Sequence, residues 1–189
     1  LASRSTGGTE AVKVCCLDAS RFVGRILDES AGVVAMSATL EPFEFYRELL
    51  GFSPERTDEL YVPSPFPASN RLVVCIPDVD TTFRSRAAHY DRIADWIARL
   101  AHPDYNVLTL FPSYRFLESV RDRLPPVGHR LLVQEPSSSD AVQASVLDAL
   151  ASGQPQLVFA VLGGIFAEGV DYPGEMLSQV IVVSPGLPQ

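Results

Sequence analysis

A glycine-rich, acidic segment at residues 163–174 constrains the fold of this chain more than any other stretch. It reads Gly-Gly-Ile-Phe-Ala-Glu-Gly-Val-Asp-Tyr-Pro-Gly, and apolar runs at 156–162 and 179–184 flank it. Four glycines and a proline in twelve residues predict a loop, because glycine weakens helices and strands and proline removes a backbone donor. The loop carries two acids, Glu168 and Asp171, within an otherwise apolar sequence. A strand, a glycine-rich loop and a second strand are typical of a ligand site at the carboxyl end of a parallel sheet.

Two interpretations of this loop remain open on composition alone. It is a ligand site, or it is only a tight crossover between two buried strands. The loop is not a Walker A sequence, since no Gly-Lys-Ser/Thr follows it, and it is not a Gly-x-Gly-x-x-Gly dinucleotide turn.

The chain from residue 71 onward alternates regularly between strand-like and helix-like patterns. Apolar runs predict strands at 72–76, 106–111, 130–134, 157–161 and 180–183, and helical periodicity predicts helices at 86–101, 113–124 and 140–152. Strands of nearly continuous apolar character that alternate with helices predict an α/β domain with a parallel sheet covered on both faces.

The first seventy residues are organised differently. They predict a flexible end over 1–10, a helix at 19–29, a short buried strand at 33–36, and a helix that begins near Pro42 and closes at Gly51. Residues 52–70 contain four prolines and no periodicity, which indicates a linker or an extended crossing. One strand cannot form a sheet alone, so 33–36 must join the later sheet, lean on it, or belong to a neighbouring domain.

Charge and cysteine content narrow the classes of function. The net charge is −8, and only one of the fifteen basic residues is a lysine, which argues against a broad polybasic nucleic-acid surface. A narrow groove that uses a few arginines and backbone amides remains compatible with this charge. The three cysteines show no Cys-x-x-Cys spacing, so we expect reduced, largely buried thiols in a cytoplasmic protein. No apolar run approaches the roughly 20 residues of a membrane span, and we expect no membrane contact.

Five short stretches carry a resemblance to a known family. In chain order they are Cys16-Leu-Asp-Ala-Ser20, Met36-Ser-Ala-Thr-Leu40, Ser64-Pro65-Phe66, Phe111-Pro-Ser-Tyr114, and Glu168-Gly-Val-Asp171 with Pro173-Gly174. In that order they resemble the lead-in to motif III, motif III, the segment that follows it, motif IV and motif V of the DinG/XPD-like branch of superfamily 2 DNA helicases.

The resemblance implies a motor of two RecA-like domains, each a doubly wound parallel sheet with helices on both faces. The two domains would grip ATP and Mg²⁺ between them and move along single-stranded DNA. Residues 1–51 would be the end of the first motor domain, 52–70 a linker, and 71–189 the second motor domain, truncated before motif VI. We expect this chain to be inactive alone and to bind single-stranded DNA weakly, with the first motor domain as its partner in the same parent chain.

The resemblance also implies roles for individual residues. Ser37, Ala38 and Thr39 would couple nucleotide state to DNA; Glu168, Gly169 and Asp171 would face the nucleotide; Ser113, Tyr114 and Gly164 would lie toward the DNA backbone. Each group has a purely structural alternative: Ser113 as a helix N-cap, Tyr114 as a packed side chain, and the Ser37 and Thr39 hydroxyls as parts of a turn.

The chain departs from the family in several respects. Part of the family has Arg and Lys where this loop has Gly163 and Ile165. The chain lacks a Walker A lysine, an Asp-Glu-x-His box and any metal-ligand cluster, while the arginine of motif VI would lie beyond Gln189. An iron–sulfur cluster is possible in the parent but not in this chain. Two alternatives are therefore kept: a free-standing nucleotide- or phosphate-binding α/β domain, and a degenerate motor domain that serves as a protein-interaction module.

Overall fold

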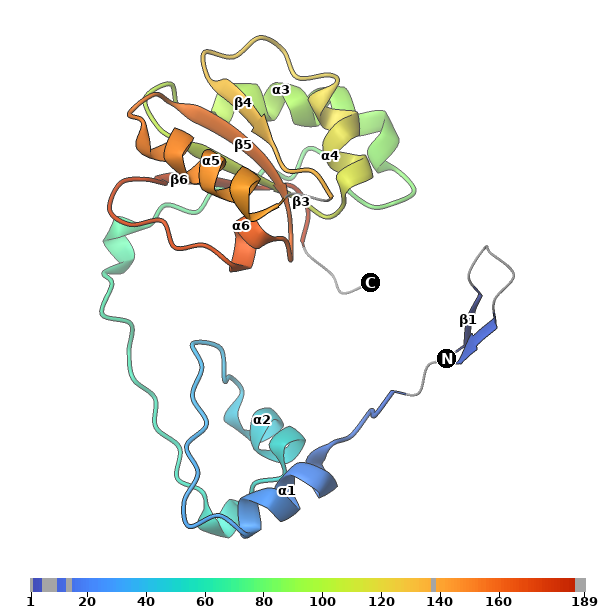
Figure 1. The fold of residues 1–189 in the computed structure, drawn as a ribbon, viewed down its shortest axis with the longest axis vertical. Helices are drawn as coiled ribbons and strands as arrows, with labels where there is room; N and C mark the ends of the chain where they lie inside the picture. The colour runs from blue at the N-terminus through green and yellow to red at the C-terminus, as the bar shows by residue number, and fades with distance from the viewer. Residues whose placement is uncertain (1, 5–9, 13–14, 137–138, 186–189) are drawn as a thin grey trace. The chain divides into compact units, whose positions relative to one another are not determined.

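Four parallel strands form one sheet in the C-terminal part of the computed structural model, which describes residues 2–4, 10–12, 15–136 and 139–185 (Figure 1). The strands are β3 (Val107–Phe111), β4 (Arg130–Val133), β5 (Gln156–Val161) and β6 (Gln179–Val182), in the spatial order β4-β5-β3-β6. Each neighbouring pair is parallel, with Phe111 opposite Val161 and Leu110 opposite Val182. The carboxyl ends of all four strands therefore lie at the same edge.

Helices cover both faces of this sheet. The 3-10 turn η3 (Arg86–His89) leads into α3 (Tyr90–Leu100), which packs on one face together with α4 (Tyr114–Arg121). On the other face lie α5 (Asp140–Ala151) and the single-turn helix α6 (Ile165–Glu168). The predicted fold class, a RecA-like doubly wound parallel sheet, is confirmed in its α/β character, its parallel pairing and its two helical layers.

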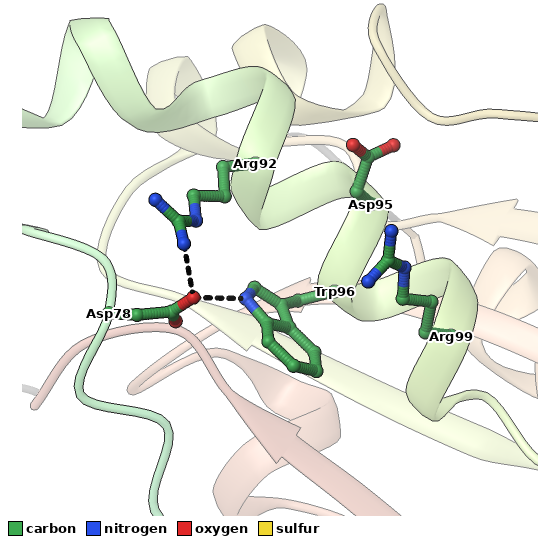
Figure 2. Close-up of a pocket in the computed structure, with 5 residues that line it drawn as sticks. All are labelled: Asp78, Arg92, Asp95, Trp96 and Arg99. Carbon is green, nitrogen blue, oxygen red and sulfur yellow. Dashed lines mark hydrogen bonds and ion pairs between the residues drawn. The ribbon is translucent and has the colours of Figure 1, made fainter.

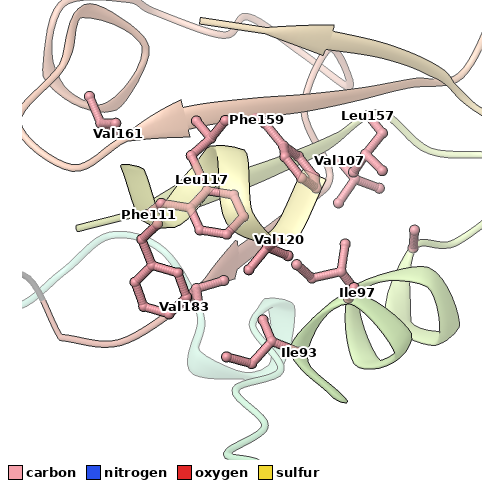
Figure 3. Packing of buried hydrophobic residues seen from close by; sticks show 13 residues of the cluster. Ile93, Ile97, Val107, Phe111, Leu117, Val120, Leu157, Phe159, Val161 and Val183 are labelled. Carbon is pink, nitrogen blue, oxygen red and sulfur yellow. The ribbon is translucent and has the colours of Figure 1, made fainter. Parts of the chain in front are cut away.

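The side chains of β3 and β5 alternate between two separate cores, as the two-residue period of a strand requires. Figure 3 shows the core beneath α3 and α4, where Phe111 and Phe159 meet with ring centroids 4.9 Å apart. The opposite core contains Leu108, Leu110, Val158 and Ala160 from the strands, with Val146, Leu150 and Phe166 from the helices. Burial of each large apolar side chain stabilises the fold by about 1.5–3 kcal/mol. The two cores therefore hold the sheet, and with it the ends of its strands, in a fixed position.

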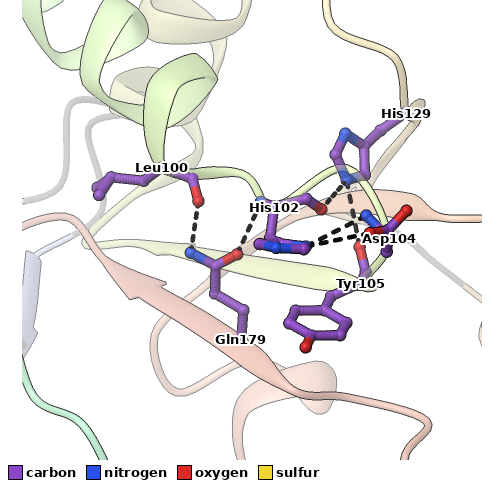
Figure 4. A network of polar contacts seen from close by, with 6 residues as sticks. All are labelled: Leu100, His102, Asp104, Tyr105, His129 and Gln179. Atoms are coloured by element: carbon purple, nitrogen blue, oxygen red, sulfur yellow. Dashed lines mark hydrogen bonds and ion pairs between the residues drawn. The ribbon is translucent and has the colours of Figure 1, made fainter.

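Side-chain hydrogen bonds close the amino edge of the sheet (Figure 4). Gln179, the first residue of β6, donates from Nε2 to the Leu100 carbonyl at 2.7 Å and accepts from the His102 amide at 3.0 Å. His129 Nε2 lies 2.9 Å from the His102 carbonyl and 3.2 Å from the Tyr105 carbonyl. Because both partners are acceptors, Nε2 carries the proton.

Asn106 extends this closure to the chain that returns from the glycine-rich segment. Its Nδ2 donates to the carbonyls of Leu150 at 2.8 Å and Met176 at 2.9 Å, and its Oδ1 accepts from the Gln156 amide at 2.9 Å. One asparagine thus ties α5, β5 and the chain that follows the glycine-rich segment together at the amino edge.

A polar clamp holds the segment that precedes η3 against α3 (Figure 2). Asp78 Oδ2 accepts from Arg92 at 2.7 Å and from the Trp96 indole at 3.1 Å. A pocket of about 200 Å³ beside this clamp is lined by Asp78, Arg92, Asp95, Trp96 and Arg99. The clamp gives these residues a structural role on the outer surface of α3.

The chain divides by its internal contacts into the units Leu1–Leu72 and Val73–Gln189, and the first unit is described by itself. It contains strands β1 (Ala2–Arg4) and β2 (Glu10–Val12), helices α1 (Ser20–Asp28) and α2 (Phe43–Leu50), and 3-10 turns η1 (Pro54–Arg56) and η2 (Ala68–Asn70). The two helices follow the sequence prediction closely. Gly51 ends α2 in the left-handed conformation at φ 73°, and a Cβ there would lie 2.3 Å from the Ser20 carbonyl. Only glycine permits this approach of α2 to α1.

Two predicted strands are absent from the described residues. Residues 33–36 and 72–76 lie outside any strand, and Val34, Met36 and Leu72 are 80–88% exposed. The prediction was wrong because strand residues must pair, and apolar sequence alone provides no partner.

Two further predictions about the first part of the chain and the cysteines were wrong. The described parts of residues 1–10 belong to the antiparallel pair of β1 and β2, where a flexible end was expected. The cysteines Cys15, Cys16 and Cys75 are free thiols as predicted but are exposed, not buried.

Candidate functional site at the carboxyl edge of the sheet

Two sequence-predicted groups of residues come together where the parallel strands end. Ser113 and Tyr114 follow β3, and Gly164 follows β5, the strand that pairs with β3. The Leu162 amide donates to the Phe111 carbonyl at 2.8 Å, so the two chain segments leave the sheet side by side. A pair of neighbouring carboxyl ends is where an open α/β sheet places a ligand.

The turn after β5 requires glycine at two successive positions. Gly163 has φ 72°, a conformation that side chains disfavour. A Cβ on Gly164 would lie 2.9 Å from the Val161 carbonyl and 2.8 Å from Gln134 Nε2. The turn therefore approaches the end of β5 and the end of β4 as closely as the backbone allows.

The loop prediction for 163–174 was wrong over four residues, because α6 occupies Ile165–Glu168. Phe166, only 1% exposed, packs in the core beside α5 and gives this single turn of helix its tertiary support. Gly169 ends the turn, and its amide donates to the Ile165 carbonyl at 2.8 Å. A Cβ on Gly169 would lie 3.0 Å from that carbonyl, so glycine is also favoured here.

The two acids of the segment are both exposed, and only one of them lies near the glycine turn. A Cβ on Gly163 would lie 4.0 Å from Glu168 Oε1, so that carboxylate reaches back toward the turn. Asp171 follows α6 and has no hydrogen bond or ion pair with any residue that the structure describes. Its carboxylate is thus available to a ligand.

Tyr172 anchors the chain next to Asp171. Its hydroxyl donates to the Phe166 carbonyl at 2.8 Å, and its ring packs against the core beside α5. Burial of the phenol raises the pKa of Tyr172 above its ordinary value. An exposed carboxylate beside an anchored tyrosine is a well-positioned acceptor for a hydroxyl group.

The residues after β3 have the structural roles that were considered as alternatives. Ser113 is the N-cap of α4, and its Oγ accepts from the Phe116 amide at 3.4 Å. Tyr114 packs against the core beside α3 and α4, and its hydroxyl lies 3.5 Å from the Glu135 carbonyl. These contacts position both residues at the carboxyl edge, whether or not they also contact a ligand.

Sequence reasoning missed Gln134, which lies between these two groups. It follows β4, is 6% exposed, and accepts at Oε1 from the Val161 amide at 3.1 Å. The backbone amide of Gln134 donates to the Phe159 carbonyl at 2.8 Å. The available signal was a single polar residue at the end of an apolar run, which periodicity alone does not distinguish from a loop residue.

The predicted coupling residues lie in the other unit, within a turn. Thr39 donates from its amide to Ser37 Oγ at 3.3 Å, and the two hydroxyl oxygens are also 3.3 Å apart. Ser37, Ala38 and Thr39 are all exposed. The geometry is that of a local turn, and the coupling role stays a prediction.

Among the described residues, no group of three or more His, Cys, Asp or Glu side chains could hold a metal ion. None of the helices in that part of the chain is long and apolar enough to cross a bilayer.

Comparison with known proteins identifies the class of the sheet domain. Residues 97–189 match the family model described as the helicase C-terminal domain. This range includes all four strands of the sheet and the whole carboxyl edge. Residues 97–189 thus belong to the helicase C-terminal domain family.

Individual relatives define the branch of that family. The chain is 30% identical to the ATP-dependent DNA helicase DinG of Photobacterium profundum, over 85% of this chain and 25% of the relative. It is 25% identical to the ATP-dependent DNA helicase CHL1 of Saccharomyces cerevisiae, over 94% of this chain and 22% of the relative. It is also 25% identical to the ATP-dependent DNA helicase XPD of Sulfolobus acidocaldarius, over 89% of this chain and 30% of the relative. The predicted resemblance to DinG/XPD-like superfamily 2 helicases is confirmed.

The matches concern only part of each relative. The chain spans about a quarter of the length of the curated relatives it matches. A solved structure of S. tokodaii Xpd4 is 25% identical, with a TM-score of 0.32 over 45% of this chain and 17% of that chain.

Proposed function

We propose that this chain is the second motor domain of a DinG/XPD-like ATP-dependent DNA helicase. The parent enzyme would couple ATP hydrolysis, in a cleft between two motor domains, to movement along single-stranded DNA. One observation carries the proposal: the carboxyl edge of a parallel sheet brings the motif V segment and the motif IV segment together on neighbouring strands, β5 and β3. The amino edge, by contrast, is closed by side-chain hydrogen bonds.

The domain assignment follows from the same proposal. Residues 1–51 would complete the first motor domain, 52–70 would link the two, and 71–189 would form the second. The internal division of the chain after Leu72 supports a boundary in this region. The paired hydroxyls of Ser37 and Thr39 suit a coupling element, because such a short turn can exchange hydrogen-bond partners at little cost.

The nucleotide would meet the acidic side of the carboxyl edge. A carboxylate is a good acceptor for ribose hydroxyls but a poor neighbour for a triphosphate, so Asp171 would hold the sugar. Glu168 and Gly169 would position the loop around it. The sequence has no Walker A lysine, so the phosphates and their Mg²⁺ ion would be bound mainly by the other motor domain.

The DNA strand would meet the side formed by Ser113, Tyr114 and Gly164. A motor that steps along a strand must hold phosphates, because contacts to base edges would make every step depend on sequence. Gly163 is exposed and has no side chain, which leaves its main chain open to a backbone phosphate, whereas the space at Gly164 is filled by Gln134 and the Val161 carbonyl.

Binding of single-stranded DNA by the 189-residue chain tests the proposal. Fluorescence anisotropy with labelled strands of different sequence should show weak binding that does not depend on sequence. Affinity should fall with salt, because each cation that neutralises a phosphate releases counterions. The net charge of −8 should weaken binding further at low ionic strength. A salt-insensitive complex with one particular sequence would contradict a motor domain.

A further inference from the structure

We propose that Gln134 is a direct phosphate-binding residue of the carboxyl edge, donating a hydrogen bond from Nε2 to a backbone phosphate oxygen of the bound single strand. The inference rests on the proposed function and adds to it a residue that none of the sequence motifs contains. It assigns to one side chain both the support of the glycine turn and a contact with the ligand.

The orientation of the Gln134 amide follows from its surroundings. The Val161 amide donates to one atom of the Gln134 side-chain amide at 3.1 Å, and only an oxygen can accept this bond. The other atom is therefore the nitrogen, which carries two hydrogens. A Cβ on Gly164 would lie 2.8 Å from this nitrogen and 2.9 Å from the oxygen, so the amide lies directly against the turn.

Gln134 Nε2 is an unused donor that reaches solvent. The residue as a whole is 6% exposed, and Nε2 has no acceptor among the residues that the structure describes, yet it is not one of the buried polar atoms that lack a partner. Water can therefore accept its hydrogen bonds in the free chain. A ligand oxygen that displaces this water would accept the hydrogen bond in its place.

The position of Gln134 also fits a phosphate. It follows β4 and bonds to β5, while the next residue, Glu135, offers its carbonyl to the Tyr114 hydroxyl at 3.5 Å. Gln134 and Glu135 therefore join the two segments that face DNA in the proposed function. A neutral donor suits this place, because it binds a phosphate without requiring a counter-charge when the strand leaves.

Matched variants separate this contact from long-range charge. Gln134→Glu keeps an oxygen for the Val161 amide but replaces the donor with a second acceptor. Gln154→Glu adds the same charge at an exposed position before β5, at the opposite edge of the sheet. We expect Gln134→Glu to weaken binding of oligothymidylate about tenfold to a hundredfold, the size of a lost hydrogen bond to a charged group. Gln154→Glu should change the affinity by less than about twofold, as expected of an exposed charge remote from the ligand.

A third variant and a spectroscopic signal keep the test independent of folding. Gln134→Met removes the donor without adding charge, so the affinity should fall while the slope of log affinity against log salt is unchanged. In the ¹⁵N-labelled wild-type chain, the Gln134 side-chain amide signals should shift on addition of oligothymidylate. ATP and inorganic phosphate, added separately, should leave these signals nearly unmoved.

The outcomes distinguish a failure of the Gln134 contact from a failure of the proposed DNA binding. Wild-type binding with unshifted Gln134 signals and unchanged affinity in folded variants would overturn this inference but not the proposed function. Larger shifts with ATP than with oligothymidylate would overturn the assignment to DNA. No binding by the wild-type chain at low salt would overturn the proposed DNA contact and this inference with it.

Discussion

Asp171 and Tyr172 are adjacent in sequence but differ in environment. Asp171 is exposed and has no described partner, whereas Tyr172 is half-buried and bonded to the Phe166 carbonyl. A tight crossover needs only the anchor, and an exposed carboxylate without a partner is compatible with it. A nucleotide site would also use that carboxylate, so Asp171 is the residue whose replacement distinguishes the two interpretations of the glycine-rich segment.

Asp171→Ala, made in a full-length protein that contains this chain, should reduce DNA-stimulated ATP hydrolysis. The lost hydrogen bond is worth about 1–3 kcal/mol, which corresponds to a roughly five- to hundredfold loss. DNA binding without nucleotide should stay near wild type, because the contact forms only in the closed state.

The control for this variant is Asp148→Ala, which removes an exposed carboxylate from α5. A thermal melt should show both variants folded, since neither side chain is part of the core. Normal hydrolysis in Asp171→Ala, or a loss explained by unfolding, would return the segment to the interpretation of a tight crossover.

Tyr172→Phe should lower the free energy of unfolding by about 0.5–1.5 kcal/mol, because the hydrogen bond to the Phe166 carbonyl is lost. The wild type should also lose stability as the pH rises above about 10, the unfolded pKa of tyrosine. Burial raises the pKa of Tyr172, so the folded state favours the neutral phenol and the unfolded chain releases its proton first. Urea unfolding from about pH 9 to pH 11 should therefore show a smaller decline in the phenylalanine variant than in the wild type. Equal declines would contradict the burial of this phenol.

Helices were predicted well because their apolar positions repeat within a single segment. The pattern at 86–101 and 140–152 matched η3 with α3 and α5 to within a residue or two. Strands were predicted well wherever the run pairs with another strand, as all four strands of the sheet do. The runs at 33–36 and 72–76 are as apolar but remain unpaired among the described residues, because pairing depends on segments distant in sequence.

The candidate site was predictable to a similar extent. Glycines, acids and motif order identified the segment after β5 and the serine after β3. The short helix α6 depends on the burial of Phe166 against α5, which no local pattern reveals. The contact of Gln134 with Val161 joins residues 27 positions apart, so it required the structure.

Gly164→Ala tests how tightly the turn after β5 is packed. The added methyl would lie 2.9 Å from the Val161 carbonyl, a backbone atom that cannot move aside, as well as against Gln134. The variant should lose about 1–3 kcal/mol of unfolding free energy, as overpacked sites do. Gly128→Ala is the matched control, since a Cβ there meets nothing within 4 Å. Equal urea midpoints for the two variants would show that the turn has room for a side chain.

In the proposed function, the chain of 189 residues forms one side of the ATP cleft. It has a net charge of −8, no Walker A lysine and, among its described residues, no cluster that could hold a metal ion. Phosphoryl transfer requires a phosphate cradle, a metal ion and positive charge near the transferred group. In the proposed motor the other domain would supply these features, and the carboxyl edge of this chain would bind and position ligands.

ATP hydrolysis by the purified 189-residue chain, compared with a full-length protein that contains it, decides whether the chain is one half of a motor. We expect no turnover above background from the chain alone, with or without single-stranded DNA. We expect DNA-stimulated turnover from the full-length protein under the same conditions. Turnover by the chain alone that disappears in Asp171→Ala would contradict the account, because it would make the carboxyl edge a complete active site.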